Sequence, residues 1–262
     1  MLSVRAIDVE LEGKDESSLT EIITLYGVFC PADQAAHCQT FWRLVGVGIS
    51  SRLAEYCITR LLTLTDVTGR PMHEDHLVTP SRWSELPNRK LCQRIANLLE
   101  RATCATNRRE TVARDDVYLY QTGMAAIYHA HQLLTRWRGT QSVVFGFPYE
   151  LTLKLVETWG PSTKFYPFGD GNDLKQFEAY LEAESNEGRS IQAVWCECPS
   201  NPLLKTADLH KMRQLADKYG FAIVVDETIG GFANVDMLGV ADIIVTSLTK
   251  SFSGFADVMG GR

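Results

Sequence analysis

The sequence has no long apolar run. No part of its 262 residues approaches the roughly 18 consecutive apolar residues of a membrane-spanning helix. The N-terminal stretch MLSVRAIDVELEGKDESS carries acids and has no continuous apolar centre, which excludes an ordinary secretory signal. We therefore expect a cytoplasmic protein with no membrane among its partners.

A cluster of positive charge is also missing. The formal net charge is −6, and the most basic stretch, RATCATNRRE, is short and interrupted by Glu110. Surfaces that bind nucleic acid are built from extended arrays of Lys and Arg. We therefore expect no nucleic acid partner.

Paired cysteine motifs are absent as well. The chain has seven cysteines, an odd number, and none forms Cys-x-x-Cys. Cys196 and Cys198 alternate within an apolar run, where a buried free thiol is the ordinary role. The pattern predicts no metal site and indicates a reducing compartment.

A regular alternation of helix-like and strand-like segments begins near residue 115. The strand-like runs, such as AIVV at 222–225, are apolar on both sides. This pattern predicts an α/β fold, in which βαβ units form a mostly parallel sheet with helices on both faces. The expected helices are 124–137, 149–160, 173–185 and 207–220, and the expected strands are 142–147, 163–168, 191–198, 221–227 and 241–248.

Residues 1–114 give a less regular signal. The segment 35–64 has a mostly helical pattern, 67–90 is broken by Pro and other breakers, and 91–105 is helical again. We therefore predict that 1–114 is a mainly helical N-terminal region with extended connections. The α/β domain is expected to cover 115–262.

Polar residues follow several of the expected strands. Ligands of open α/β sheets bind at the carboxyl ends of the strands. Asp226 ends one strand, and Lys250 follows the next, with Ser247 and Thr249 just before it. Taken singly, such an Asp usually caps a turn and such a Lys usually lies on the surface. Together at successive strand ends they favour a site.

These residues match the requirements of pyridoxal phosphate. The cofactor needs an amine for a Schiff base, here Lys250, and a carboxylate to keep its ring nitrogen protonated, here Asp226. Its phosphate suits backbone N–H groups at a helix start, as at Gly123, with hydroxyls nearby. Tyr149 could stack on the ring.

The Gly-x-Gly of GVGISSR suggests a dinucleotide-binding turn as a different class of site. The third glycine is missing, and helix-like FWRL precedes the pair in place of a strand. The dinucleotide reading is therefore disfavoured.

Four segments carry a family resemblance: YQTGMAAI, ECPSNPLL, VVDET and SLTKSFSG. They resemble the Cys/Met-metabolism family of pyridoxal-phosphate enzymes, which includes cystathionine γ-synthase, cystathionine lyases and homoserine-ester sulfhydrylases. The resemblance covers about 115–261 and looks closest to the fungal cystathionine γ-synthase branch, which GVGISSRLAE also resembles. It implies an aspartate-aminotransferase-like (type I) large domain.

The resemblance also implies a role for each site residue. Lys250 would form the Schiff base and move protons, and Tyr149 would stack on the ring as a second catalytic residue. Asp226 would pair with the ring nitrogen. The other cofactor contacts would be the backbone of Gly123 and Met124, the hydroxyls of Ser247 and Thr249, and Asn201 and Thr228 in the wall.

The reaction that the resemblance implies is γ-replacement on an O-acylated homoserine with cysteine, carried out by a homo-oligomer, a dimer or tetramer. Three alternatives stay open. They are elimination by a cystathionine lyase-type enzyme, γ-replacement with another nucleophile in specialised metabolism, and a non-catalytic cofactor-binding remnant.

Three departures from the family pattern concern the site. Thr122 replaces the usual Ser, and Pro80 stands where a Tyr-x-Arg segment would place Tyr before Arg82. The sequence stops at Arg262, where family members continue into a small domain with an arginine for the substrate carboxylate. We therefore expect that small domain to be absent and the 262-residue chain to be a poor catalyst by itself.

Overall fold

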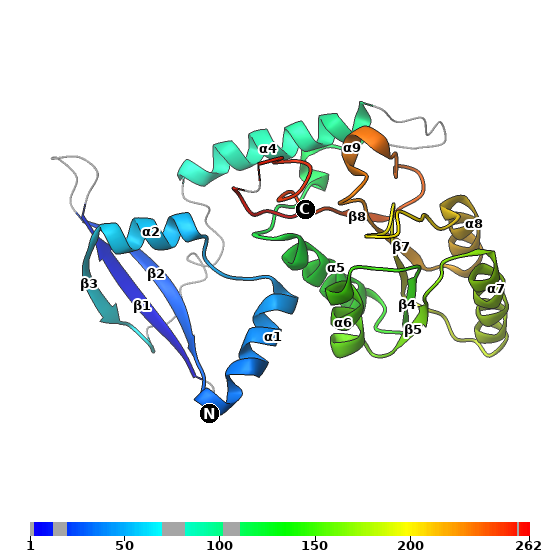
Figure 1. Cartoon of the computed structure of the whole chain (residues 1–262), viewed down its shortest axis with the longest axis horizontal. Coiled ribbons are helices and arrows are strands. Elements are labelled where there is room, and N and C mark those ends of the chain that lie inside the picture. Colours follow the sequence, from blue (N-terminus) through cyan, green and yellow to red (C-terminus); the bar gives the residue numbers. More distant parts are fainter. Residues whose placement is uncertain (1–2, 13–19, 70–81, 102–110, 256) are drawn as a thin grey trace. The chain divides into compact units, whose positions relative to one another are not determined.

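The chain folds into two compact units. The computed structural model describes residues 3–12, 20–69, 82–101, 111–255 and 257–262, with the side chains of 82–85 outside the description (Figure 1). One unit comprises 1–43 and 48–85, and the other comprises 44–47 and 86–262. Pro80, and the side chain of Arg82, are therefore outside the described residues. Among the described residues, no helix has the length and apolar content needed to cross a membrane.

The first unit is built on an antiparallel sheet of order β2-β1-β3. Its strands are β1 (Ser3–Leu11), β2 (Glu21–Phe29) and β3 (Leu61–Asp66). Val9 and Leu11 of β1 form a small core with Cys57 of helix α2 (Ser51–Thr59). Alternate residues of a strand point to opposite faces, so this period-two burial identifies the covered face of the sheet.

The expectation of a mainly helical N-terminal region is therefore wrong. Helices α1 (Ala35–Val45) and α2 lie where the pattern of 35–64 placed them, but Leu61–Asp66 is a strand. Its Leu-rich sequence suits a helix, yet pairing with β1 decides its conformation. SVRAIDVEL and EIITLYGVF are rich in β-branched and aromatic residues, which is the strand signal in this region.

The second unit contains a five-stranded sheet of order β5-β4-β6-β7-β8, and every pairing in it is parallel. The predicted α/β pattern is confirmed here. The strands are β4 (Ser142–Phe145), β5 (Thr163–Tyr166), β6 (Ala193–Glu197), β7 (Ala222–Asp226) and β8 (Ile243–Val245). The helices are α4 (Arg82–Glu100), α5 (Gly123–Trp137), α6 (Glu150–Trp159), α7 (Gly171–Asn186), α8 (Leu209–Tyr219) and α9 (Gly231–Asn234). Short 3-10 helices occur at Ala32–Gln34 and Arg114–Asp116.

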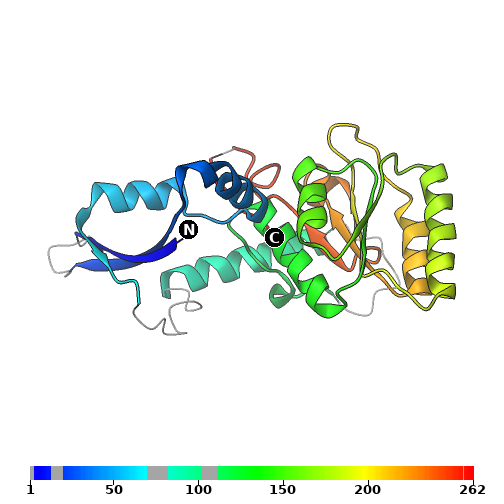
Figure 2. The ribbon, with the colours of Figure 1, turned by 90° about the horizontal axis from the view of Figure 1, so that it is seen from below.

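Helices cover both faces of this sheet. On one face α7 and α8 pack against alternate strand residues, among them Val194 and Ile223. On the other face α5 and α6 pack against residues such as Val144 and Trp195. Figure 2 shows the sheet between the two helical layers. Strands β4, β6 and β7 are apolar in continuous runs because both of their faces are buried.

The register of the sheet brings three strand ends together. Glu197 at the end of β6 pairs with Asp226 at the end of β7, which in turn pairs with Val245 at the end of β8. Residues that follow these positions must therefore lie along one edge of the sheet. That edge is where the predicted site residues are expected to meet.

Gly261 pairs with two backbone segments beside this edge of the sheet. Its N–H and C=O exchange hydrogen bonds with Tyr120 at 2.9 and 2.8 Å, and it also forms a β-bridge with Ser247. A Cβ added at Gly261 would lie 2.1 Å from the carbonyl oxygen of Thr122 and 2.8 Å from the Cα of Gly123. This close approach requires glycine, because a side chain would push the start of α5 away.

We predict that Gly261→Ala destabilises the chain by about 1–3 kcal/mol, the usual result of forcing a group into a packed position. The measurement is the free energy of unfolding in a denaturant titration. Gly171→Ala is the matched control, because a Cβ there meets nothing within 4 Å, and a change below about 0.5 kcal/mol is expected. Equal effects of the two variants would contradict the steric argument.

Candidate active site

One cavity of about 450 Å³ lies at the carboxyl ends of β6, β7 and β8. It brings together all nine residues that the sequence predicted for the site, although their individual roles stay predictions. Those residues are Gly123, Met124, Tyr149, Asn201, Asp226, Thr228, Ser247, Thr249 and Lys250.

The start of α5 forms one end of the cavity. Thr122 is the N-cap: its hydroxyl oxygen accepts the N–H of Ala125 at 3.0 Å and donates to the carbonyl of Gly46 at 2.8 Å. The N–H groups of Gly123 and Met124 lie in the first turn, where no helix carbonyl can accept them. This end of the cavity therefore offers backbone donors to an anion.

Gly123 allows Ser247 to approach the helix start closely. A Cβ added at Gly123 would lie 2.8 Å from the Cβ of Ser247. The backbone N–H of Ser247 is held by the hydroxyl of Thr228 at 2.8 Å. The Ser247 hydroxyl therefore lies at the same end of the cavity as the free N–H groups of α5.

Gly46 belongs to the GVGISSR segment and supports that helix start. It has a φ of +67°, and an added Cβ would lie 2.2 Å from the Thr122 hydroxyl oxygen. The segment follows helix α1, as the sequence analysis expected, so it lacks the strand that a dinucleotide-binding turn requires.

Asp226 supplies a carboxylate to the cavity. Its Oδ1 accepts the N–H of Thr228 at 2.8 Å. Burial raises the pKa of Asp226, while the hydrogen bonds from Thr228 and the charge of Arg262 oppose that rise. A positive group placed against this carboxylate would compensate the lost hydration and favour the ionised form.

Lys250 lies in a turn after β8. Its N–H donates to the carbonyl of Ser247 at 3.2 Å, and its own carbonyl accepts the N–H of Gly254 at 2.9 Å. The side chain is exposed and lines the cavity, so its amine is accessible. The Thr249 hydroxyl also borders the cavity, but it accepts the N–H of Gly260 at 3.1 Å and is partly occupied by this loop.

Tyr149 and Asn201 come from two different loops and share one partner. The N–H of Tyr149, just before α6, donates to Oε1 of Glu197 at 2.5 Å, and the N–H of Asn201 donates to Oε2 at 3.1 Å. Glu197 itself lines the cavity. Glu197 is not among the residues predicted from the sequence, although an acid inside the apolar run AVWCEC was an available signal. The other lining residues that the sequence analysis did not assign are Thr122, Ile127, Pro199, Ile229, Thr246 and Met259.

Cys196 and Cys198 lie in the core of the second unit, as expected. Both are buried free thiols, and burial raises the pKa of each. Within the described ranges, no group of three or more His, Cys, Asp or Glu side chains could hold a metal ion.

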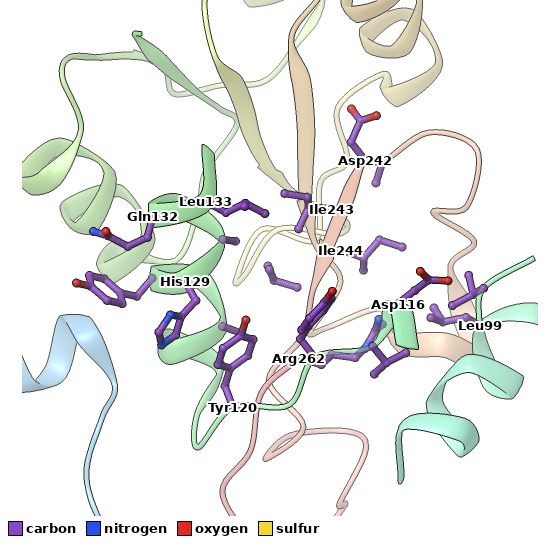
Figure 3. A pocket seen from close by; sticks show the side chains of 18 of the residues that line it. Leu99, Asp116, Tyr120, His129, Gln132, Leu133, Asp242, Ile243, Ile244 and Arg262 are labelled. Atoms are coloured by element: carbon purple, nitrogen blue, oxygen red, sulfur yellow. The ribbon is translucent and has the colours of Figure 1, made fainter. Parts of the chain in front are cut away.

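A buried ion pair lies next to the site. Arg262 pairs with Glu227, and the Glu227 carboxylate also accepts the Thr246 hydroxyl at 3.2 Å. The guanidinium lies 4.6 Å from the centroid of the Phe232 ring. Arg262 also borders a second cavity of about 780 Å³ with Tyr120 and His129 (Figure 3), which contains none of the nine predicted site residues.

Comparison with solved structures supports the fold. The second unit has a parallel sheet flanked by helices, with a cavity at its strand ends. The chain is similar to the crystal structure of metB from Corynebacterium glutamicum, with a TM-score of 0.51 and 22% identity. The match covers 74% of this chain and 46% of that one.

The family follows from the sequence comparison. The model of the family "Cys/Met metabolism PLP-dependent enzyme" matches residues 93–262, and the chain belongs to that family.

Three curated relatives that are similar to this chain carry different names. The alanine racemase ungC of Aspergillus violaceofuscus is 42% identical over 91% of this chain and 42% of its own length. The cystathionine γ-synthase-like enzyme iboG1 of Amanita muscaria is 39% identical over 90% of this chain and 45% of its own length. The cystathionine γ-synthase of Neurospora crassa is 51% identical over 56% of this chain and 24% of its own length. The chain therefore spans less than half the length of these relatives.

We predict that Glu227→Gln lowers the free energy of unfolding by about 3–5 kcal/mol, because it leaves the buried guanidinium of Arg262 without a counter-charge. Chemical denaturation measures the change. Asp217→Asn is the matched control: this exposed partner of Arg213 should contribute at most about 1 kcal/mol. A Glu227→Gln effect as small as the control would show that the buried pair contributes nothing to stability.

Proposed function

We propose that this chain is a pyridoxal-phosphate-dependent enzyme that carries out cystathionine γ-synthase-like γ-replacement on an O-acylated homoserine, with cysteine as the nucleophile. The observation that supports it is the convergence of Lys250, Asp226 and the start of α5 on one cavity. Residues 115–262 would then form the cofactor-binding large domain, within a homo-oligomer.

The two ends of the cavity fit the two charged ends of this cofactor. Free N–H groups at Gly123 and Met124, with the nearby Ser247 hydroxyl, suit a phosphate. At Asp226, burial disfavours a lone carboxylate, so a protonated ring nitrogen would restore the balance. Gly123 carries no side chain to fill the space between α5 and Ser247.

Each of the predicted site residues would have a separate role in the reaction. Pyridoxal phosphate, when bound, supplies an aldehyde for amino groups and a ring that withdraws electrons from the substrate's α-carbon. Lys250 would hold the cofactor and carry protons at its Nζ. Asp226 would keep the ring nitrogen positive, and Tyr149 would cover the ring and keep water from that side.

Racemisation of an amino acid such as alanine is a second candidate. The relative ungC, 42% identical over 91% of this chain, carries the name alanine racemase. Both reactions begin with loss of the α-proton, which Lys250 would accept in either case. Racemisation then returns a proton to the opposite side, whereas γ-replacement needs proton movement at the β-carbon and departure of the γ-group.

We predict that the purified chain binds pyridoxal phosphate and that borohydride reduction leaves a pyridoxyl group on Lys250. Peptide mapping by mass spectrometry reads out the position, and Lys250→Ala should abolish the label. Lys205→Ala is the matched control, because Lys205 lines a small cavity beside the site and should keep full labelling. A pyridoxyl group on another lysine would overturn the assignment of Lys250.

The products formed by the loaded chain distinguish the reactions. We predict formation of cystathionine from an O-acylhomoserine and cysteine, at the low rate expected of a poor catalyst. Asp226→Asn should lower that rate by more than about tenfold, because the neutral amide gives up the charge pairing that is worth several kcal/mol. D-alanine formed from L-alanine would favour the racemase reading. Release of a keto acid without cystathionine would favour elimination, and tight cofactor binding without turnover would favour a remnant.

A further inference from the structure

Glu197 accepts hydrogen bonds from two loops that both line the cavity. It is the last residue of β6 and only 8% exposed. One carboxylate oxygen accepts the N–H of Tyr149 at 2.5 Å, and the other accepts the N–H of Asn201 at 3.1 Å. The first loop joins β4 to α6, and the second joins β6 to α8. We name this pair of bonds the Glu197 bridge.

The bridge needs both oxygens of the carboxylate. An ionised carboxyl group accepts hydrogen bonds at either oxygen, whereas a protonated one uses one oxygen as a donor. Bonds from N–H groups to an ionised acceptor are also the stronger kind. Protonation of Glu197 would therefore weaken the hold on one of the two loops.

We propose that Glu197 is a positioning residue, whose ionised carboxylate fixes the backbone at Tyr149 and Asn201 and so shapes the wall that receives the cofactor. The cofactor part of this inference rests on the proposed function. The Glu197 bridge itself is a property of the chain without any ligand.

Burial and the neighbouring charges place the ionisation of Glu197 near neutral pH. Burial raises the pKa of Glu197 to about 7, the nearby Asp226 carboxylate adds to the rise, and the two N–H donors oppose it. Lys250 lies in the same cavity wall, and Lys205 faces a smaller cavity that Glu197 also lines. The thiol of Cys196, on the same strand, interacts with the charge of Glu197, and the phenol of Tyr149, just before α6, lines the same cavity.

A rise in pH has opposite effects on the Glu197 bridge and on the stability of the whole fold. Because the folded pKa of Glu197 exceeds the usual 4.5, its contribution to global stability falls as pH rises from that value towards about 7. The Glu197 bridge changes in the opposite direction, since the ionised form holds both loops. Neutral to alkaline pH should therefore tighten the cavity wall.

A titration of backbone amide resonances tests the bridge without cofactor. We expect the amide proton signals of Tyr149 and Asn201 to shift together between about pH 5.5 and 8.5, with a common midpoint near 7 as Glu197 ionises. The shift should vanish in Glu197→Gln and persist in Asp226→Asn, which removes the neighbouring carboxylate. Constant amide shifts, or a titration that survives Glu197→Gln, would overturn the bridge.

Two further variants separate positioning from simple support of the fold. Glu197→Asp keeps the charge but is one methylene shorter, so it should keep only one of the two amide signals in its shifted state. Glu157→Gln, at an exposed position on α6, is the matched control and should leave both titrations unchanged. Retention of both shifted signals in Glu197→Asp would contradict the two-point geometry.

Cofactor affinity connects the bridge to the site. We expect Glu197→Gln to bind pyridoxal phosphate roughly tenfold more weakly or worse, as loss of a charge-assisted hydrogen bond implies. The wild-type chain should bind more tightly at pH 8 than at about pH 6. Unchanged affinity in a variant that has lost the amide titration would overturn the positioning role. If the wild-type chain does not bind pyridoxal phosphate, the proposed function is wrong. The amide titration alone then decides whether the Glu197 bridge exists.

Discussion

The parallel pairing of β6, β7 and β8 is the constraint on which the site depends. It aligns Glu197, Asp226 and Val245, so that the segments after all three strands emerge at one edge. Lys250 and Asp226 line the same cavity because of this register and of the turn that follows β8, although they are far apart in the sequence. A one-residue slip would turn every side chain to the other face and separate the set.

Three acids near this edge show how the chain compensates buried charge in different ways. Burial raises the pKa of Glu197, Asp226 and Glu227 alike. Glu227 has the guanidinium of Arg262, and Glu197 has two backbone N–H groups. Within the described residues, Asp226 has the hydrogen bonds from Thr228 and the charge of Arg262, with no ion pair recorded. It is therefore the acid of the three that most needs a positive ligand, which agrees with its predicted role.

Much of the second unit could be predicted from sequence because its signals are local. Strands β4, β6, β7 and β8 are apolar runs that end at, or just before, a polar residue or a glycine. The helices between them have clear periodicity. The first unit could not be predicted in this way, because Leu61–Asp66 becomes a strand only by pairing with β1, far along the chain. Glu197 was missed for a related reason: its two partners, Tyr149 and Asn201, are brought to it by the fold.

The residues predicted to hold the cofactor would not by themselves choose the reaction. Relatives named cystathionine γ-synthase and alanine racemase are 51% and 42% identical to this chain over their matched regions. Racemisation needs a proton returned to the opposite side of the α-carbon, whereas γ-replacement needs proton movement at the β-carbon and departure of the γ-group, so groups beside the predicted nine would have to contribute to the choice. Ile127, Ile229 and Met259 line the cavity and give it apolar wall. Apolar walls discriminate weakly between side chains of similar size, so polar groups that meet the γ-substituent would have to set the specificity.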